Sequence, residues 1–130
     1  MSSRTSSALP SFDEPRLALA VEQLTPDEMG KLPYGVIRLD NDGRVTLYSA
    51  CEEALSGKEA ASVVGQPFFT DIAPCMNNPN FRGRIDRAMA AGKVDIELLH
   101  IGDFSDRDRE IQVRVQSASH GGLWIFLHRL

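Results

Sequence analysis

Long apolar runs are absent from this sequence. No window approaches the roughly 18 apolar residues of a membrane-spanning helix, and residues 1–10 are Ser-rich and polar, without the apolar stretch of a signal peptide. Clusters of positive charge are absent too: 14 scattered basic residues stand against 18 acidic ones, for a formal net charge of -4. Such a chain has no attraction for phosphate backbones. We expect a cytoplasmic protein that binds neither nucleic acid nor membrane.

Cysteine is scarce. Cys51 and Cys75 form no CxxC and match no metal-ligand spacing. We expect no disulfide between them, because a reducing compartment disfavours it. A thiol hydrolase would need a histidine base within hydrogen-bond reach of its cysteine. The three histidines fall on predicted strands or in a turn far along the chain: His100, His120 and His128. We therefore expect no enzymatic activity.

Length and composition indicate one compact domain. The chain has 130 residues, of which 42% are hydrophobic and 25% are charged, as in ordinary globular domains. We divide it into an N-terminal cap, residues 1–31, with a frayed Ser-rich start, and a core domain, residues 32–130. The cap is predicted to hold two short helices, over residues 15–24 and 26–30.

The two cap helices have different sequence patterns. Leu17, Val21 and Leu24 place a narrow apolar stripe on one side of the first helix, which therefore needs a surface to cover. Thr25 and Glu28 have the spacing of a capping box, with a proline at the first helical position of the second helix.

The core domain is predicted to be α+β. Five β-prone runs occupy residues 34–40, 44–49, 94–101, 109–117 and 123–130; an irregular helical segment (50–72) and one longer helix (79–91) lie between the second and third. The fourth run alternates apolar and polar residues, which predicts one wet face, and the fifth is apolar on both faces, which predicts a central strand. This order is that of a PAS-type domain: a five-stranded antiparallel sheet with helices on both sides, here with an N-terminal helical cap.

Tyr48 and Glu52 are a candidate pair of hydrogen-bond donors. They stand four residues apart where the second strand gives way to a helical turn, so both can point at one spot beneath the sheet, while Glu53 should face water. A phenol and a protonated carboxylic acid can together bind a buried oxyanion, because desolvation raises the pKa of a buried carboxyl group. A solvated surface glutamate is the alternative interpretation.

Cys75 is the second candidate. It follows Pro74 and comes after Phe68 and Phe69, at the exit of the helical segment, where a loop would present its thiol. The alternative for Cys75, and our interpretation of Cys51, is a small buried apolar residue.

Three motifs together resemble the photoactive yellow proteins, blue-light receptors with a PAS fold. They are Tyr-Ser-Ala-Cys-Glu at residues 48–52, Ser-Gly-Lys at 56–58 and Val-Gly-Gln-Pro-Phe-Phe-Thr-Asp-Ile-Ala-Pro-Cys at 64–75. The similarity continues through Asn-Pro-Asn-Phe at 78–81 and the closing Trp-Ile-Phe-Leu-His-Arg-Leu at 124–130. It covers the chain from about residue 32 to the C-terminus.

The resemblance implies a chromophore. In that family the cysteine matched by Cys75 carries 4-hydroxycinnamic acid (p-coumaric acid) as a thioester, and the residues matched by Tyr48 and Glu52 donate hydrogen bonds to its buried phenolate. Ser56 matches a position that is usually threonine and that binds the tyrosine hydroxyl. Lys58 stands where well-known members carry a shielding arginine, and a lysine cannot reproduce that planar group.

The resemblance also assigns Phe68 and Phe104 to the chromophore site, although the region from His100 to Phe104 has fewer aromatic residues than relatives often place there. It implies that light isomerises the chromophore, that Glu52 gives up its proton, and that the cap helices loosen to signal to a downstream protein. A chromophore-free PAS module that binds a partner or a small ligand, with Cys75 as a plain core thiol, is the alternative function. A thiol enzyme is the third.

Overall fold

The computed structural model describes residues 9–101 and 108–130, which leaves out residues 1–8 of the Ser-rich start and Phe104. Five strands form one antiparallel sheet in the order β2-β1-β5-β4-β3. Their bounds are β1 Gly35–Leu39, β2 Val45–Tyr48, β3 Asp95–Ile101, β4 Glu110–Ser117 and β5 Leu123–Arg129. The expected α+β sheet is confirmed, and its last strand, β5, is the central one.

The helices follow the predicted order. They are α1 Leu17–Glu22, α2 Pro26–Gly30, α3 Ala50–Ser56, α4 Ala60–Val63, the π-helical turn η2 Phe68–Ile72, the 3-10 turn η3 Pro74–Met76, and α5 Arg82–Ala90. The capping box of α2 is present: Thr25 Oγ1 accepts from the backbone N–H of Glu28, whose side chain accepts from that of Thr25. Among the described residues no helix is both long and apolar enough to cross a bilayer.

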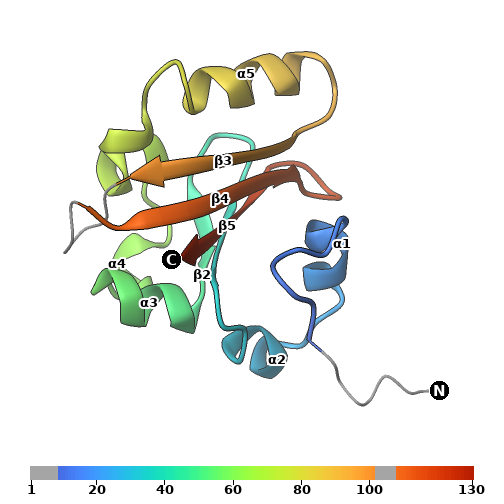
Figure 1. Ribbon diagram of the computed structural model, residues 1–130, viewed down its shortest axis with the longest axis vertical. Coiled ribbons are helices and arrows are strands. Elements are labelled where there is room, and N and C mark those ends of the chain that lie inside the picture. The colour runs from blue at the N-terminus through green and yellow to red at the C-terminus, as the bar shows by residue number, and fades with distance from the viewer. Residues whose placement is uncertain (1–8, 102–107) are drawn as a thin grey trace.

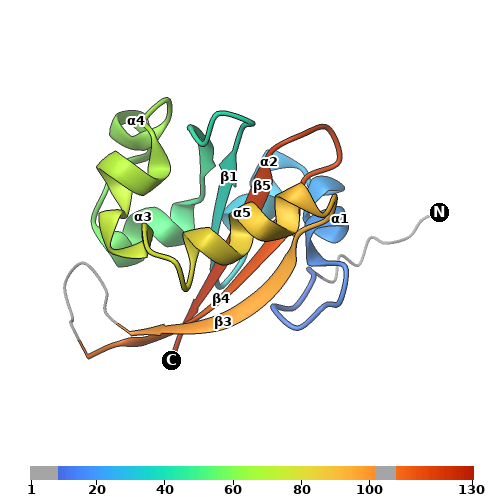
Figure 2. The same ribbon diagram turned by 90° about the horizontal axis from the view of Figure 1, so that it is seen from above.

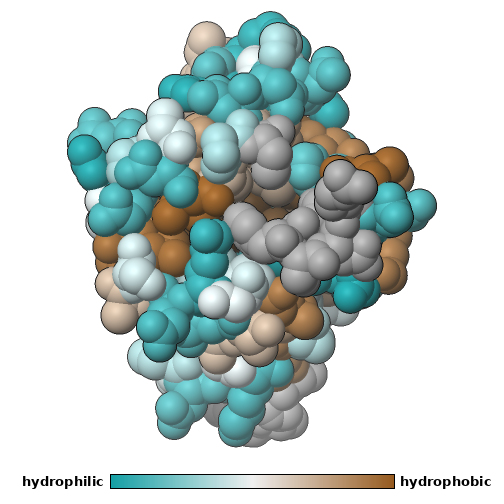
Figure 3. Space-filling view, turned by 90° about the vertical axis from the view of Figure 1, so that its left-hand side faces the viewer, coloured by the Kyte–Doolittle hydropathy of each residue, from teal (hydrophilic) through white to brown (hydrophobic). Residues whose placement is uncertain are grey.

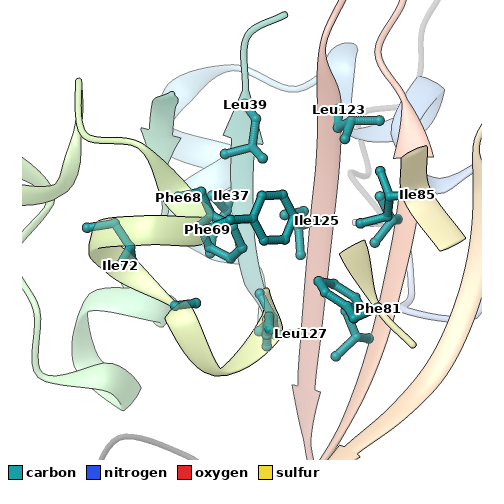
Figure 4. Close-up of a cluster of buried hydrophobic side chains, with 14 of the residues drawn as sticks. Ile37, Leu39, Phe68, Phe69, Ile72, Phe81, Ile85, Leu123, Ile125 and Leu127 are labelled. Atoms are coloured by element: carbon teal, nitrogen blue, oxygen red, sulfur yellow. The ribbon is translucent and has the colours of Figure 1, made fainter. Parts of the chain in front are cut away.

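One face of the sheet carries the larger apolar core. Phe69 of η2 points toward Ile125 of β5, and Phe81 and Ile85 lie on the other side of that strand, toward α5 (Figure 4). Phe68 and Ile72 of η2 belong to the same buried cluster. The rings of Phe68 and Phe69 meet edge to face, with centroids 5.0 Å apart. Tyr48 of β2 and Met76 of η3 belong to the same buried cluster. The segment between β2 and β3 therefore covers this face, as predicted.

The opposite face is covered by the N-terminal cap. Figures 1 and 2 show α1 and α2 across the sheet from α3 and α4, with α5 lying over the face that α3 and α4 also cover. Leu17 and Val21 are fully buried against Val36, Trp124 and Phe126, and Phe12 joins them from the segment that precedes α1.

The predicted wet face of β4 is wrong for half of the strand. Glu110, Gln112 and Arg114 were expected on a solvated face, but Arg114, and Gln116 on the same face, are buried beneath the cap, with 5% and 6% of their surfaces exposed. The Arg114 guanidinium donates to the carbonyl oxygens of Phe12, Glu14 and Pro15. Gln116 donates to the Pro15 carbonyl at 2.9 Å and accepts from the Ala18 N–H at 2.7 Å. The cap provides backbone partners that the local alternation of β4 does not reveal.

Glu22 adds a second polar attachment of the cap. Its carboxylate accepts from the Trp124 indole N–H at 2.8 Å and from both the backbone N–H and the hydroxyl of Ser119. Burial by itself would raise the pKa of this carboxyl, but the hydrogen bonds from Ser119 and Trp124 outweigh it and hold the pKa of Glu22 below its usual value. The cap is thus bound by polar contacts as well as by the apolar stripe.

Candidate functional site

Tyr48 and Ser56 form a buried hydroxyl pair. They end β2 and α3, and their hydroxyl oxygens lie 2.7 Å apart. The backbone N–H of Lys58 donates to the same Ser56 oxygen at 3.1 Å, just past Gly57, whose φ of +78° ends α3 in the left-handed conformation. Because the Ser56 oxygen already accepts one hydrogen bond, its own proton can point at Tyr48. The phenol proton of Tyr48 can then serve another acceptor.

Glu52 is buried on the same helix, with 1% of its surface exposed. Ser49 caps α3: its hydroxyl accepts from the Glu52 N–H at 3.3 Å and from the Val36 N–H at 3.0 Å, which ties the first turn of α3 to β1. A Cβ added at Gly35 would stand 2.0 Å from Glu52 Oε1. The missing side chain of Gly35 therefore lets the carboxyl group lie against the sheet.

Arg129 is the partner of Glu52 that sequence reasoning missed. Its Nη1 lies 2.7 Å from Glu52 Oε1 and its Nη2 lies 2.8 Å from Oε2, a two-point ion pair between side chains that are 4% and 1% exposed. Strand parity could have placed Arg129 on a buried face, although not beside Glu52. Residues 123, 125, 127 and 129 of β5 share one face, and the first three were already assigned to a buried face.

The other expected site residues occupy different places. Phe68 is buried in the core face, 1% exposed. Lys58 is half-buried after α3, where it lines an open hollow with Asp71 and Ile72. The backbone of Cys75 lies in η3, within a segment whose buried members Ala73 and Met76 belong to the core.

Of the two neighbours of Glu52, Glu53 was expected to face water and Cys51 to be a small buried apolar residue. The expectation that Glu53 simply faces water is wrong: its Oε2 accepts from the backbone N–H of Ala60 at 2.6 Å and so supports the start of α4. Cys51 is a free, half-buried cysteine. Burial and the charge of Glu52 raise the pKa of its thiol, and Arg129 opposes them.

The arrangement suits recognition of a buried anion better than nucleophilic catalysis. Two kinds of hydrogen-bond donor, a phenol oriented by Ser56 and a carboxyl group that can hold a proton, lie on the α3 side of the sheet beside an apolar wall. Arg129 brings the positive charge that a buried anion needs.

The PAS fold family model matches residues 30–128. The photoactive yellow protein of Halochromatium salexigens is 30% identical over 112 residues, which are 85% of this chain and 90% of that relative. That of Rhodothalassium salexigens is 29% identical over 120 residues, 92% of this chain and 96% of the relative.

Among solved structures, the photoactive yellow protein domain of the sensor histidine kinase Ppr from Rhodospirillum centenum is 32% identical to this chain. It superposes with a TM-score of 0.79 over 85% of this chain and 98% of that domain. With an extensive match at 30% identity and a matching family model, the chain belongs to the photoactive yellow protein family of PAS-fold photoreceptors.

Proposed function

We propose that this chain is a blue-light photoreceptor, with no enzymatic activity, in which Cys75 carries p-coumaric acid as a thioester. The observation that supports this most directly is the buried cluster on the α3 side of the sheet: the Tyr48–Ser56 hydroxyl pair together with the buried carboxyl group of Glu52. These residues stand at the positions where family members bind a phenolate. A PAS module without a chromophore has no need to bury such donors.

The donor set fits a phenolate in its chemistry. A phenolate oxygen accepts two or three hydrogen bonds, and Tyr48 and a protonated Glu52 each have one proton to donate. Phe68 and the neighbouring buried residues supply an apolar wall for an aromatic ring. Gly35 keeps the space beside the Glu52 carboxyl group free of a side chain.

Each residue has a distinct role in this proposal. Cys75 holds the chromophore through its sulfur, Tyr48 and Glu52 donate to the phenolate oxygen, and Ser56 orients the Tyr48 hydroxyl. Phe68 packs against the ring, Phe104 lies outside the described residues, and Lys58 takes the place of the shielding arginine without its planar group. When bound, the p-coumaroyl group supplies the absorption of blue light and the trans-to-cis isomerisation.

The response to light would begin at Glu52. Loss of its proton leaves a buried carboxylate, and the fold answers by loosening the cap, residues 9–31, from its face of the sheet. One relative is a domain of a sensor histidine kinase, and we propose that this chain likewise signals to a downstream protein or domain.

Reconstitution tests the attachment. Purified chain supplied with an activated thioester of p-coumaric acid should turn yellow and gain the mass of one coumaroyl group. Cys75→Ser should do neither, whereas Cys51→Ser, the matched control, should behave as the wild type. Labelling on Cys51, or colour that persists in Cys75→Ser, contradicts the assignment and leaves the chromophore-free PAS module or a thiol enzyme.

The role of Glu52 is tested separately. Glu52→Gln should shift the absorption band to the red and slow or abolish protonation of the phenolate after a flash. Glu53→Gln should change little, because the amide keeps an oxygen for the Ala60 N–H. Infrared difference spectra of the wild type in which light removes no protonated-carboxyl band would show that Glu52 is not the proton donor.

A further inference from the structure

The ion pair between Arg129 and Glu52 has no role in the mechanism proposed so far. The Nη1 of Arg129 donates to Glu52 Oε1 at 2.7 Å and its Nη2 donates to Oε2 at 2.8 Å, and the two side chains are 4% and 1% exposed. A charge buried to this extent is stable only with a partner of opposite charge. The geometry is that of an ionised carboxylate, because a planar guanidinium matches two equivalent oxygens.

This pair limits how much negative charge the site can hold. One cation and one anion balance each other. A phenolate placed beside an ionised Glu52 would leave one anion unbalanced in a region of low dielectric, where repulsion between like charges is strong. Either the second anion stays outside, or Glu52 takes up a proton when it arrives.

We infer that Arg129 is the counter-ion of the site, a positioning residue that fixes its negative charge at one. In the chromophore-free chain that charge is the Glu52 carboxylate. In the loaded dark state Glu52 holds one proton. The phenol group of the chromophore gives up one proton, so the site as a whole takes up none from solvent. Protonated Glu52 keeps an acceptor oxygen for Arg129 while its hydroxyl donates to the anion. The second half of this inference rests on the proposed function; the first half does not.

Other groups act on the same pair. Cys51 precedes Glu52 on α3, and its thiol senses both charges, since Glu52 raises and Arg129 lowers its pKa, after burial as the main cause. Ser49 is uncharged, and its hydroxyl holds the first turn of α3 in place by accepting from the backbone N–H groups of Glu52 and Val36. Tyr48 and Ser56 complete the polar groups of this part of the site. Lys58, just past the C-terminal end of α3, is itself assigned to the site, so the matched control is Arg44, an exposed cation that donates to the Gly65 carbonyl.

Infrared spectroscopy of the chromophore-free chain at neutral pH is the first test. The difference between wild type and Glu52→Gln should show an ionised carboxylate and no protonated-carboxyl band. Arg129→Gln should gain a protonated-carboxyl band that disappears when Glu52→Gln is added, and Arg129→Lys should restore the carboxylate. A protonated Glu52 in the unloaded wild type overturns the inference, and this measurement holds even if Arg129→Gln does not fold.

The loaded chain gives the second test. In Arg129→Gln the pH at which half of the yellow form is lost should move upward by one unit or more, a tenfold change in the ionisation constant. Arg44→Gln, which removes a cation outside the site, should move it much less, and an equal shift in both variants would contradict the assignment to Arg129. If no yellow form is obtained at all, the proposed function fails, while the infrared result still decides the charge state of the pair.

Discussion

Removing the Arg114 guanidinium should release the cap without unfolding the sheet. Arg114 lies on β4, and its side chain donates to three carbonyl oxygens of the segment that precedes α1, at residues 12, 14 and 15. It also lies over the Phe12 ring, with the guanidinium carbon 5.9 Å from the ring centroid. Arg114→Gln removes the charge and most of these donors but keeps a side chain of polar character.

The size of the effect follows from those contacts. A hydrogen bond from a charged donor contributes about 1.5–3 kcal/mol, but three bonds from one guanidinium are not additive, and the carbonyls regain water when the cap opens. We expect cap docking to weaken by about 2–4 kcal/mol, which is roughly a 30- to 900-fold increase in the open population. This is comparable with the burial of one large side chain of α1, worth about 1.5–3 kcal/mol.

Amide hydrogen exchange in the dark measures this directly. The Ala18 amide is a reporter of docking, since it donates to Gln116 across the interface, and the Ile125 amide reports the central strand. Arg114→Gln should accelerate exchange at Ala18 and leave Ile125 protected. Arg44→Gln is the control, because Arg44 also donates to a backbone carbonyl, that of Gly65, but outside the cap. Equal acceleration at Ala18 and Ile125, or none at Ala18, would refute a separately docked cap.

Three further results are expected. Gly35→Ala should lower the free energy of unfolding by about 2–4 kcal/mol in urea titrations, because its methyl group would displace the Glu52 carboxyl group from its ion pair; an unchanged midpoint would contradict the close approach. Ser56→Ala should cost about 1–2 kcal/mol, with Ser56→Thr restoring the lost hydroxyl. The lowered pKa of Glu22 means that its carboxylate stabilises cap docking above the ordinary carboxyl value of 4.5, and that this contribution disappears as pH falls through the lower folded value. Trp124 fluorescence should follow that loss in acid, and Glu22→Gln should flatten the transition.

Much of the fold was predictable from patterns that act over short distances. The capping box at Thr25 and Glu28 and the doubly apolar fifth strand are local signals, and the structure contains both. The wet face of β4 was wrong for a physical reason. Alternation along a strand shows which face is polar, but Arg114 and Gln116 find their partners about 100 residues away in the cap, and only the folded chain brings those carbonyls to them.

The candidate site divides in the same way. The Tyr48–Ser56 contact spans eight residues, and the resemblance implied it because Ser56 matches a position that binds the tyrosine hydroxyl. The Glu52–Arg129 pair spans 77 residues and depends on the pairing of β5 with β1. No local sequence pattern predicts that pairing. Lys58 was assigned to the site because of its place in the motif. Arg129, which contacts Glu52, lies 77 residues further along the chain.

The two buried arginines bind different kinds of partner, and this difference decides where a proton can act. Arg114 holds the cap through backbone carbonyls, which do not titrate, and its contact with the exposed carboxylate of Glu97, at 3.7 Å, is made to the neighbouring strand β3 and not to the cap. Arg129 binds Glu52, whose charge changes with one proton. In the proposed mechanism, a change at Glu52 would reach the cap through β5, the strand that carries Arg129 at one end and Trp124, the partner of Glu22, at the other. If light opens the cap as proposed, Arg129 compensates the newly formed Glu52 carboxylate and so reduces the free energy that favours opening. Arg129→Gln should then enlarge the light-induced amide exchange at α1.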